Sequence, residues 1–325
     1  MPKSNLKPIG LGVLTVILLV LPFILTAYYV DIMIMLLINI LVVVSFRFIA
    51  LTGDFSVAHI PLMGAGAYAS ALMGLRLGLP FWLTLPLAGL TAALVGLVMC
   101  YPLLRMKAFA FFLGSYAAGE AMRLSWIRFR NPFGGHTGIT NVPPPESIPL
   151  PGLGTIDFAE VIPYYFLTLG VTALCLVIMY RLEKFRIGDT LKAIHSEDNL
   201  VKSVGINVTT YRALAFLIGS FFAGISGVLL VHRLGAVDPY QFSLAATLYL
   251  LVWVVVGGLG TFAGPIIGVV TLTVISELIR GFVEWVPLVY GFILIAILLF
   301  LPEGLEGLPK KMQLMAKRVM KHAGQ

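Results

Sequence analysis

The chain has 325 residues, of which 59% are hydrophobic and 11% are charged, and its formal net charge is +7. An average soluble domain carries about 25% charged residues, so this chain has too few to cover a surface exposed to water, and a soluble globular fold is excluded. The composition indicates a polytopic membrane protein, in which a basic excess follows from the positive-inside rule rather than from binding to nucleic acid.

Long apolar runs follow one another along the chain. A run needs about 20 apolar residues to cross the hydrocarbon core of a bilayer. Eight runs have this length, at 9–30, 32–50, 55–75, 80–104, 108–127, 161–181, 211–231 and 286–302. Two shorter runs, 242–256 and 265–279, flank the glycine-rich stretch 257–265 and are either tilted spans or a pair of half-helices. We therefore predict an all-α polytopic membrane protein that forms one transmembrane domain over residues 1–325, with about ten spans.

Basic residues set the orientation of these spans. With a cytoplasmic N-terminus, ten spans put most of the 22 Lys and Arg residues on the cytoplasmic side, as the positive-inside rule requires. We therefore predict that both termini are cytoplasmic. In this orientation the Pro- and Gly-rich stretch 128–160 is an extracytoplasmic loop, and the charged stretch 182–210 is a cytoplasmic loop. Residues 303–325 form a basic cytoplasmic tail, whose charge either follows from the positive-inside rule or lets the tail rest on anionic lipid.

The cytoplasmic loop contains a short stretch with the signals of a helix. Ser196 is the expected N-cap, and Glu197 and Asp198 fall in the first turn, where the helix dipole favours negative charge. Gly205 suits the left-handed position that follows a last turn. The sequence therefore predicts one helix over residues 196–204.

Three aliphatic residues of this predicted helix, Leu200, Val201 and Val204, have the spacing of a single face. A helix this short is marginal in water alone. The predicted helix therefore needs a surface to pack against, and two such surfaces are equally compatible with the pattern. The apolar face lies either against the protein's own membrane bundle or lipid surface, or in a groove on a soluble partner.

Five stretches in chain order resemble one known family. They are TGDFSVAH (52–59) with GAGAY (64–68), GEAMRL (119–124), GDTLKAI (188–194) with VGINVTTYR (204–212), GGLGT (257–261) with GP (264–265), and LPEGL (301–305). Together they cover about residues 35–308, and they resemble the LivM-type permeases of branched-chain amino acid ABC importers. The chain departs from the family pattern at Asp54, Ala58 and Asp189.

The resemblance implies a permease subunit of an ATP-driven ABC importer for branched-chain or related amino acids. Its implied partners are a second homologous permease, with which it forms the translocation pathway, two ABC ATPase subunits and an extracytoplasmic substrate-binding protein. The implied location is the plasma (inner) membrane of a bacterium or archaeon. The loop would then supply the coupling helix that contacts an ATPase subunit, through Ser196, Glu197, Asp198, Leu200, Val201, Val204 and Gly205.

The chain has no G-x-x-x-x-G-K-[ST] phosphate-binding motif. We therefore expect no cofactor on this chain, with ATP and Mg²⁺ used by the partner ATPase subunits, and no enzymatic activity of its own. The five histidines have no metal-ligand spacing, so no metal site is expected.

Polar and small residues inside or beside the spans are the candidates for the substrate pathway, because ionisable groups and broken helices are costly in a membrane. These candidates are Asn39, Asp54, His59, Gly64, Gly66, Glu120, Gly258 and Gly260. Each has a structural alternative. These are an ion pair of Glu120 with Arg123 three residues later, a plain tight turn at 257–265, a position at the headgroup level for Asp54 and His59, and contacts between helices for Asn39, Gly64 and Gly66.

Two alternative functions fit the same residues. One is a stand-alone secondary transporter driven by an ion gradient, in which Glu120, Glu277 and Asp54 are the coupling carboxylates. The other is an ABC permease of the same family that carries urea or a small organic acid. The presence or absence of ATPase subunits and a binding protein separates the importer from the secondary transporter.

Overall fold

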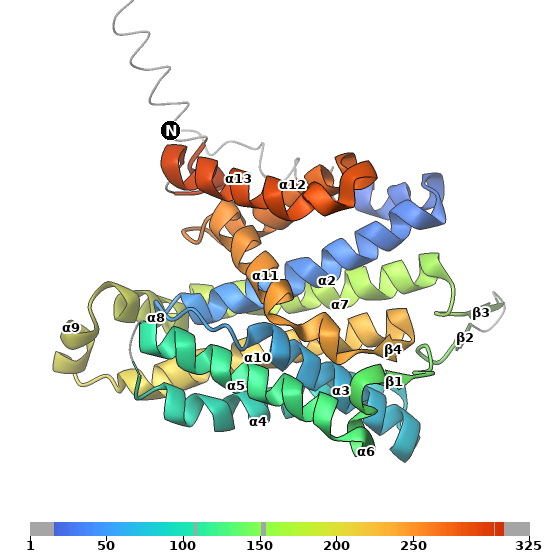
Figure 1. Ribbon diagram of the computed structural model, residues 1–325, viewed down its shortest axis with the longest axis horizontal. Helices are drawn as coiled ribbons and strands as arrows, with labels where there is room; N and C mark the ends of the chain where they lie inside the picture. Colours follow the sequence, from blue (N-terminus) through green and yellow to red (C-terminus); the bar gives the residue numbers. More distant parts are fainter. Residues whose placement is uncertain (1–15, 107–108, 151–153, 302, 309–325) are drawn as a thin grey trace, which may run out of the picture.

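The computed structural model describes residues 16–106, 109–150, 154–301 and 303–308, and helices make up nearly all of it (Figure 1). The long helices are α2 (Ala27–Ala50), α3 (His59–Leu77), α4 (Phe81–Leu103), α5 (Phe109–Arg128), α7 (Val161–Lys184) and α10 (Val208–Leu234). Shorter helices are α6 (Arg130–Phe133), α8 (Arg186–Ser196), α9 (Asp198–Ser203), α11 (Leu244–Gly257), α12 (Gly264–Leu278) and α13 (Val286–Phe300). The chain is thus an all-α polytopic membrane protein, as predicted.

Within the described residues, four helices are long and apolar enough to cross a membrane, namely α2, α4, α7 and α10. Helices α11, α12 and α13 are apolar but shorter, with 14 or 15 residues each. Helices α3 and α5 overlap the predicted runs 55–75 and 108–127. The first predicted run and the basic tail lie partly outside the described residues. The described part of that first run is helical over 16–24 and breaks at 25–26.

Two helices begin four or five residues away from the predicted position. Helix α2 begins at Ala27 instead of residue 32, because the charge of Asp31 is paired with Arg233 of α10 and does not end the helix. Helix α3 begins at His59 instead of residue 55. The preceding residues form turns in which Gly53 has a φ of +87°, a conformation that glycine adopts without steric cost.

Helix α10 lies at the centre of the bundle and packs against α2, α3 and α4. Small residues let these backbones approach closely. Gly66 of α3 lies against Gly224 of α10, and Gly227 of α10 lies against the carbonyl oxygen of Met63. Such contacts are a usual basis of helix association in lipid, where the hydrophobic effect between helices is absent.

We expect Gly227→Ala to lower the stability of the protein by about 1–3 kcal/mol, the cost typical of overpacking, because the added Cβ meets the carbonyl oxygen of Met63. The matched control is Gly170→Ala in α7, where an added Cβ meets nothing within 4 Å. The measurement is the apparent Tm of the purified protein in mild detergent. Equal Tm values for the two variants would contradict the close contact.

A second layer of α11, α12 and α13 lies on the other side of α2 (Figure 1). Helix α12 packs against α2, and α11 packs against both α12 and α13. Short 3-10 turns complete the described chain: η1 (Gly135–Thr137), η2 (Pro239–Phe242), η3 (Arg280–Trp285) and η4 (Leu305–Gly307).

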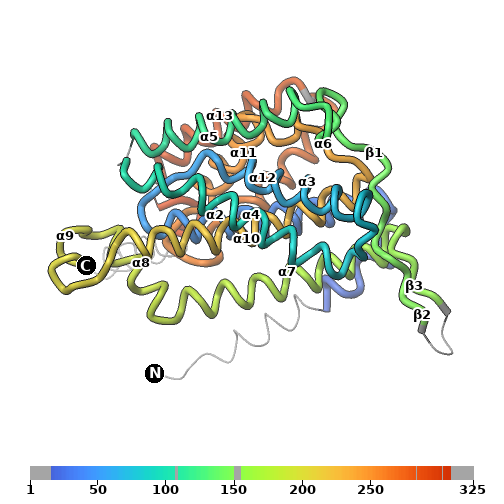
Figure 2. The backbone as a smooth tube through the Cα atoms, turned by 90° about the horizontal axis from the view of Figure 1, so that it is seen from below, coloured from blue at the N-terminus to red at the C-terminus, as the bar shows by residue number. Residues whose placement is uncertain are grey.

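The two ends of the bundle carry different structures (Figure 2). Helices α8 and α9 lie at one end, which we call the α8–α9 end. The antiparallel hairpin of β2 (Ile148–Leu150) and β3 (Gly154–Ile156) lies at the opposite end, which we call the β2–β3 end. There β1 (Ile139–Thr140) pairs with β4 (Ala236–Val237), which ties the segment after α5 to the end of α10.

Candidate functional site

The stretch 182–210 contains two short helices where one was predicted. Helix α8 continues to Ser196, and the extended residue Glu197 is the N-cap of α9, which begins at Asp198. The prediction of a helix that starts with Ser196 as its N-cap is therefore wrong. The Ser196 hydroxyl donates a hydrogen bond to the carbonyl oxygen of Lys192 at 3.1 Å, and this bond to the preceding turn of α8 takes the place of a cap.

Helix α9 ends as its sequence predicts. Gly205 has a φ of +86°, and its N–H donates to the carbonyl oxygen of Lys202 at 3.0 Å. The N–H of Ile206 donates to the carbonyl oxygen of Val201 at 3.3 Å. These two hydrogen bonds form a Schellman motif, which satisfies carbonyl groups that the helix end would otherwise leave open. Asp198 and Lys202 form an ion pair of 3.0 Å one turn apart.

The three aliphatic residues of α9 do not share one face, contrary to the prediction. Val201 is 7% exposed and packs with Ile194 of α8 and Val208 of α10. Leu200 and Val204 are 64% and 74% exposed. Val201 therefore holds α9 against its own bundle, while two large aliphatic side chains stand out from the α8–α9 end.

Beneath α8 lies a buried charge network that the sequence analysis did not identify. Arg47, near the end of α2, is 1% exposed, and both of its terminal nitrogens donate to the carboxylate of Glu183 at the end of α7. Its Nε donates to the carbonyl oxygen of Leu259, between α11 and α12, at 3.2 Å. Lys192 of α8 lies 2.9 Å from the same carboxylate. One ion cluster thus connects α2, α7, α8 and the α11–α12 turn.

Asp54 lies near the same end, in the segment between α2 and α3. Its carboxylate is 3.3 Å from Arg212 at the start of α10 and accepts a hydrogen bond from the Thr52 hydroxyl at 3.1 Å. Burial raises the pKa of the Asp54 carboxyl above its ordinary value, although the positive charge of Arg212 acts in the opposite direction. The imidazole of His195 in α8 fills the space that a side chain at Gly53 would need. The segment is therefore in direct contact with α8.

The glycine-rich stretch 257–265 forms the turn of a helical hairpin, because α11 and α12 pack side by side. Gly258, with a φ of +99°, follows the last residue of α11. The carboxylate of Glu306 accepts hydrogen bonds from the N–H groups of Gly260 at 2.6 Å and Thr261 at 2.8 Å. This negative charge lies close to the start of α12, where the helix dipole stabilises it. Gly258 and Gly260 thus belong to a turn held by the segment after α13.

Three other candidates, His59, Gly64 and Gly66, lie in contacts between helices. His59 is fully buried, and its Nε2 is 2.9 Å from the hydroxyl of Ser45 in α2. Gly64 lies against the rings of Trp126 and Phe242. Gly66, described above, lies at the crossing of α3 and α10. Contact between helices, the structural alternative for Gly64 and Gly66, therefore describes their surroundings, and His59 is likewise buried between helices.

Glu120 forms the ion pair that its spacing predicted, with Arg123 Nε 3.0 Å from its carboxylate. Asn39 is half-buried on α2 and lines a recess between α2, α10 and α12. Among the described residues, no group of three or more His, Cys, Asp or Glu side chains is placed to hold a metal ion.

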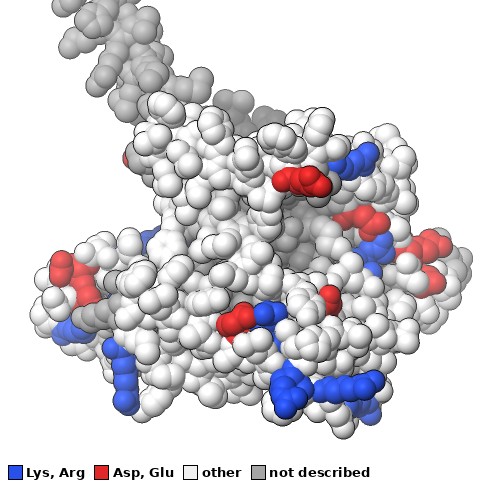
Figure 3. Space-filling model, in the orientation of Figure 1, with Lys and Arg blue, Asp and Glu red and all other residues white. Residues whose placement is uncertain are grey.

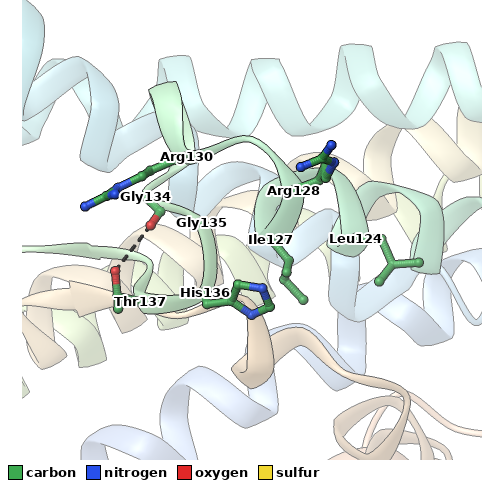
Figure 4. Close-up of a pocket in the computed structure, with 8 residues that line it drawn as sticks. All are labelled: Leu124, Ile127, Arg128, Arg130, Gly134, Gly135, His136 and Thr137. Carbon is green, nitrogen blue, oxygen red and sulfur yellow. Dashed lines mark hydrogen bonds between the residues drawn. The ribbon is translucent and has the colours of Figure 1, made fainter.

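A recess of about 690 Å³ opens near the β2–β3 end (Figure 4). Its lining side chains come from the end of α5 and from the segment that follows it, and its rim is basic. The lining residues are Leu124, Ile127, Arg128, Arg130, Gly134, Gly135, His136 and Thr137. The Thr137 hydroxyl donates to the carbonyl oxygen of Gly134 at 3.2 Å, which closes the turn.

Residues 28–302, which include most of the helical bundle, match the family model of the branched-chain amino acid transport system permease component. The chain belongs to this family. The LivM high-affinity branched-chain amino acid permease of Salmonella typhimurium is 29% identical over 310 residues, which cover 90% of this permease and 73% of the relative. LivM of Escherichia coli K12 is 30% identical over 257 residues, covering 74% and 60%. LivH of Salmonella typhimurium is 31% identical over 144 residues, covering 44% and 45%. No solved structure matches this permease.

Membership of a transport family agrees with the absence of an enzymatic role that we expected from the sequence. The sequence indicates the short α9 but not the charge network of Arg47, Glu183 and Lys192. The available signal was slight, since each residue stands as a single charge near the end of an apolar run or in the polar loop. Nothing in the local sequence of this permease indicates which charges meet.

Proposed function

We propose that this permease is a translocation subunit of an ATP-driven ABC importer for branched-chain or related amino acids. It forms half of the translocation pathway with a second homologous permease. Two ABC ATPase subunits bind ATP and Mg²⁺ and contact the α8–α9 end, while an extracytoplasmic binding protein delivers substrate to the β2–β3 end. About ten spans cross the plasma (inner) membrane of a bacterium or archaeon, and both termini are cytoplasmic.

The observation that carries this proposal is the pair of exposed aliphatic side chains on α9. Leu200 lies on the six-residue α9 and Val204 is the C-cap that follows it, and the rest of the helix surface is polar. Exposed aliphatic residues on a short, well-anchored helix are suited to a hydrophobic groove on a partner protein. Val201 and the Schellman motif hold the helix in place, so docking would cost little conformational entropy.

The relatives support a second permease as a partner. Both LivM and LivH are named as permease proteins of the same high-affinity transport system, and this chain matches each of them. A pair of related permeases is therefore the expected assembly. The basic recess of Figure 4 offers a docking surface for an extracytoplasmic protein with an acidic face, because complementary charge steers such encounters.

The charge network offers a route from the ATPase to the membrane helices. A displacement of α8 acts on Glu183 through Lys192, and Glu183 holds Arg47 of α2. Arg47 in turn holds the α11–α12 turn through Leu259. Closure of the ATPase subunits would thus move packed elements together, as alternating access requires.

The carboxylates that would couple an ion gradient in a secondary transporter each have an arginine partner. Glu120, Glu277 and Asp54 all have an arginine nitrogen within 3.3 Å. Proton uptake by any of these carboxylates would remove the charge that holds its ion pair. This arrangement fits a structural role better than a cycle of proton uptake and release.

The test is to purify the tagged permease from its native host in mild detergent and to identify the subunits that accompany it. The complex is then reconstituted, and ATP-driven uptake of leucine, urea and a small organic acid is measured with the binding protein present. ATPase subunits and leucine uptake are the expected result. A permease that purifies alone and moves substrate under an ion gradient would contradict the importer.

A further inference from the structure

A second recess, the α2–α12 recess, lies between α2, the last turn of α10 and α12. Its volume of about 580 Å³ falls within the range of about 300–1,000 Å³ that is typical of small-molecule sites. Figure 3 shows the surface hollowed between the layer of α12 and α13 and the rest of the bundle, with acidic and basic side chains beside the hollow. Its charged residues lie near the β2–β3 end, which is the outer side in the proposed orientation.

One wall of the recess carries an ion pair in which each side chain keeps one atom without a hydrogen bond. Arg233 of α10 donates to Asp31 of α2 from Nε at 2.8 Å and also from one terminal nitrogen, and both bonds go to the same oxygen, Oδ1. Within the part of the chain that the structure describes, the other oxygen of Asp31 and the second terminal nitrogen of Arg233 have no hydrogen-bond partner. One carboxylate oxygen and one guanidinium nitrogen of this ion pair therefore remain available to a ligand.

The opposite wall adds a second carboxylate and the floor adds apolar contacts. Glu277 of α12 accepts a hydrogen bond from the Tyr28 hydroxyl at 3.0 Å and lies 3.3 Å from Arg280, whose side chain is 60% exposed. Asn39 contributes an amide deeper along α2, and Ile32 and Met35 line the same recess. Opposite charges, an amide and aliphatic surface thus surround one space.

This combination matches the chemistry of an α-amino acid. The carboxylate of a zwitterion would bind the open guanidinium nitrogen of Arg233, a charge-assisted contact that is among the stronger hydrogen bonds in proteins. Its ammonium group would bind the free oxygen of Asp31 and Glu277. A branched aliphatic side chain would lie against Ile32 and Met35. A solute that carries only one of the two charges would leave part of the site unpaired, at a cost in affinity.

We propose that the α2–α12 recess binds the zwitterion of a branched-chain α-amino acid on the outer half of this permease, through Arg233, Asp31 and Glu277. The proposal rests on the proposed importer function and adds a binding site within this chain.

The test uses the assembled transporter in nanodiscs of phosphatidylglycerol, with Thr273→Cys in the recess as a reporter. The native cysteines, Cys100 and Cys175, are buried, so a water-soluble maleimide labels the introduced thiol above a low background. L-leucine at about ten times its Kd should slow the labelling about tenfold, because only the empty fraction reacts. Leucinamide, which lacks the carboxylate, and 4-methylpentanoate, which lacks the ammonium group, should slow it far less.

Two further variants make the result specific. Arg233→Gln should raise the leucine concentration needed for protection about tenfold or more, because it removes a charged hydrogen-bond donor. Thr137→Cys, on the other recess at the same end, should be labelled equally with and without leucine. Equal protection by leucine and both analogues, or protection of Thr137→Cys, would overturn the proposal.

Two further measurements, ATP-driven leucine uptake and labelling in a second lipid, separate failure of the site from failure of the importer and leucine from a lipid headgroup. ATP-driven leucine uptake without leucine protection would overturn the site and leave the importer standing. Leucine protection without such uptake would support the site and contradict the importer. Nanodiscs with phosphatidylethanolamine test the other source of a zwitterion, because a lipid headgroup that protects the thiol and makes leucine ineffective would overturn the amino-acid assignment.

Discussion

Arg47→Met should lower the free energy of unfolding by about 3–5 kcal/mol, because it leaves the buried carboxylate of Glu183 without its main partner. The guanidinium is 1% exposed and also donates to the carbonyl oxygen of Leu259. Lys192 would remain 2.9 Å from Glu183, but its side chain is 43% exposed and supplies one contact in place of a bidentate pair. The apparent Tm and the yield of monodisperse protein in mild detergent measure the loss.

A paired variant separates the unpaired charge from the lost packing. Arg47→Met combined with Glu183→Leu should recover much of the stability, since removal of both members of a buried pair is often tolerated. Lys192→Met alone should cost about 1 kcal/mol or less, as is usual for a pair with an exposed member. If Arg47→Met were as stable as Lys192→Met, the buried guanidinium would have no structural role.

The helices were largely predictable because a bilayer restricts what an apolar run can form: a lipid-exposed segment must satisfy its backbone hydrogen bonds internally. Helix α4 (Phe81–Leu103) agrees with the predicted run 80–104 to within a residue at each end. The start of α2 was less predictable, because Asp31 looked like the end of a span. Its partner Arg233 lies 202 residues away, so no local rule reveals that the charge is neutralised.

The candidate site was predictable where local chemistry acts alone. Gly205 ends α9 in the left-handed conformation because its neighbours form a Schellman motif within six residues. The inward direction of Val201 instead depends on Ile194 and Val208, which approach only after α8 and α10 have packed. The pairing of Arg47 with Glu183 spans 136 residues. Such contacts are decided by tertiary packing, which periodicity along one chain does not encode.

Leu200→Asp combined with Val204→Asp should abolish ATP-driven leucine uptake while leaving the permease folded. Both side chains are largely exposed, so their replacement should change the stability of the permease by about 0.5 kcal/mol or less. In a partner groove, each lost aliphatic contact would cost about 1.5–3 kcal/mol, and each buried unpaired carboxylate would cost more. The measurements are uptake into proteoliposomes, the amount of ATPase retained on the tagged permease, and the Tm.

A charge-matched control distinguishes docking from a general effect of negative charge. Asn199→Asp with Ser203→Asp adds the same two charges to exposed positions of α9 but keeps Leu200 and Val204, so it should retain ATPase binding and most of the uptake. Val201→Asp should fail differently, because it removes the contact that holds α9 to Ile194 and Val208 and therefore lowers the Tm as well. If the Leu200 and Val204 double variant kept full uptake, α9 would not be the contact through which ATP hydrolysis drives this permease. The exposed aliphatic pair would then have to be explained by lipid.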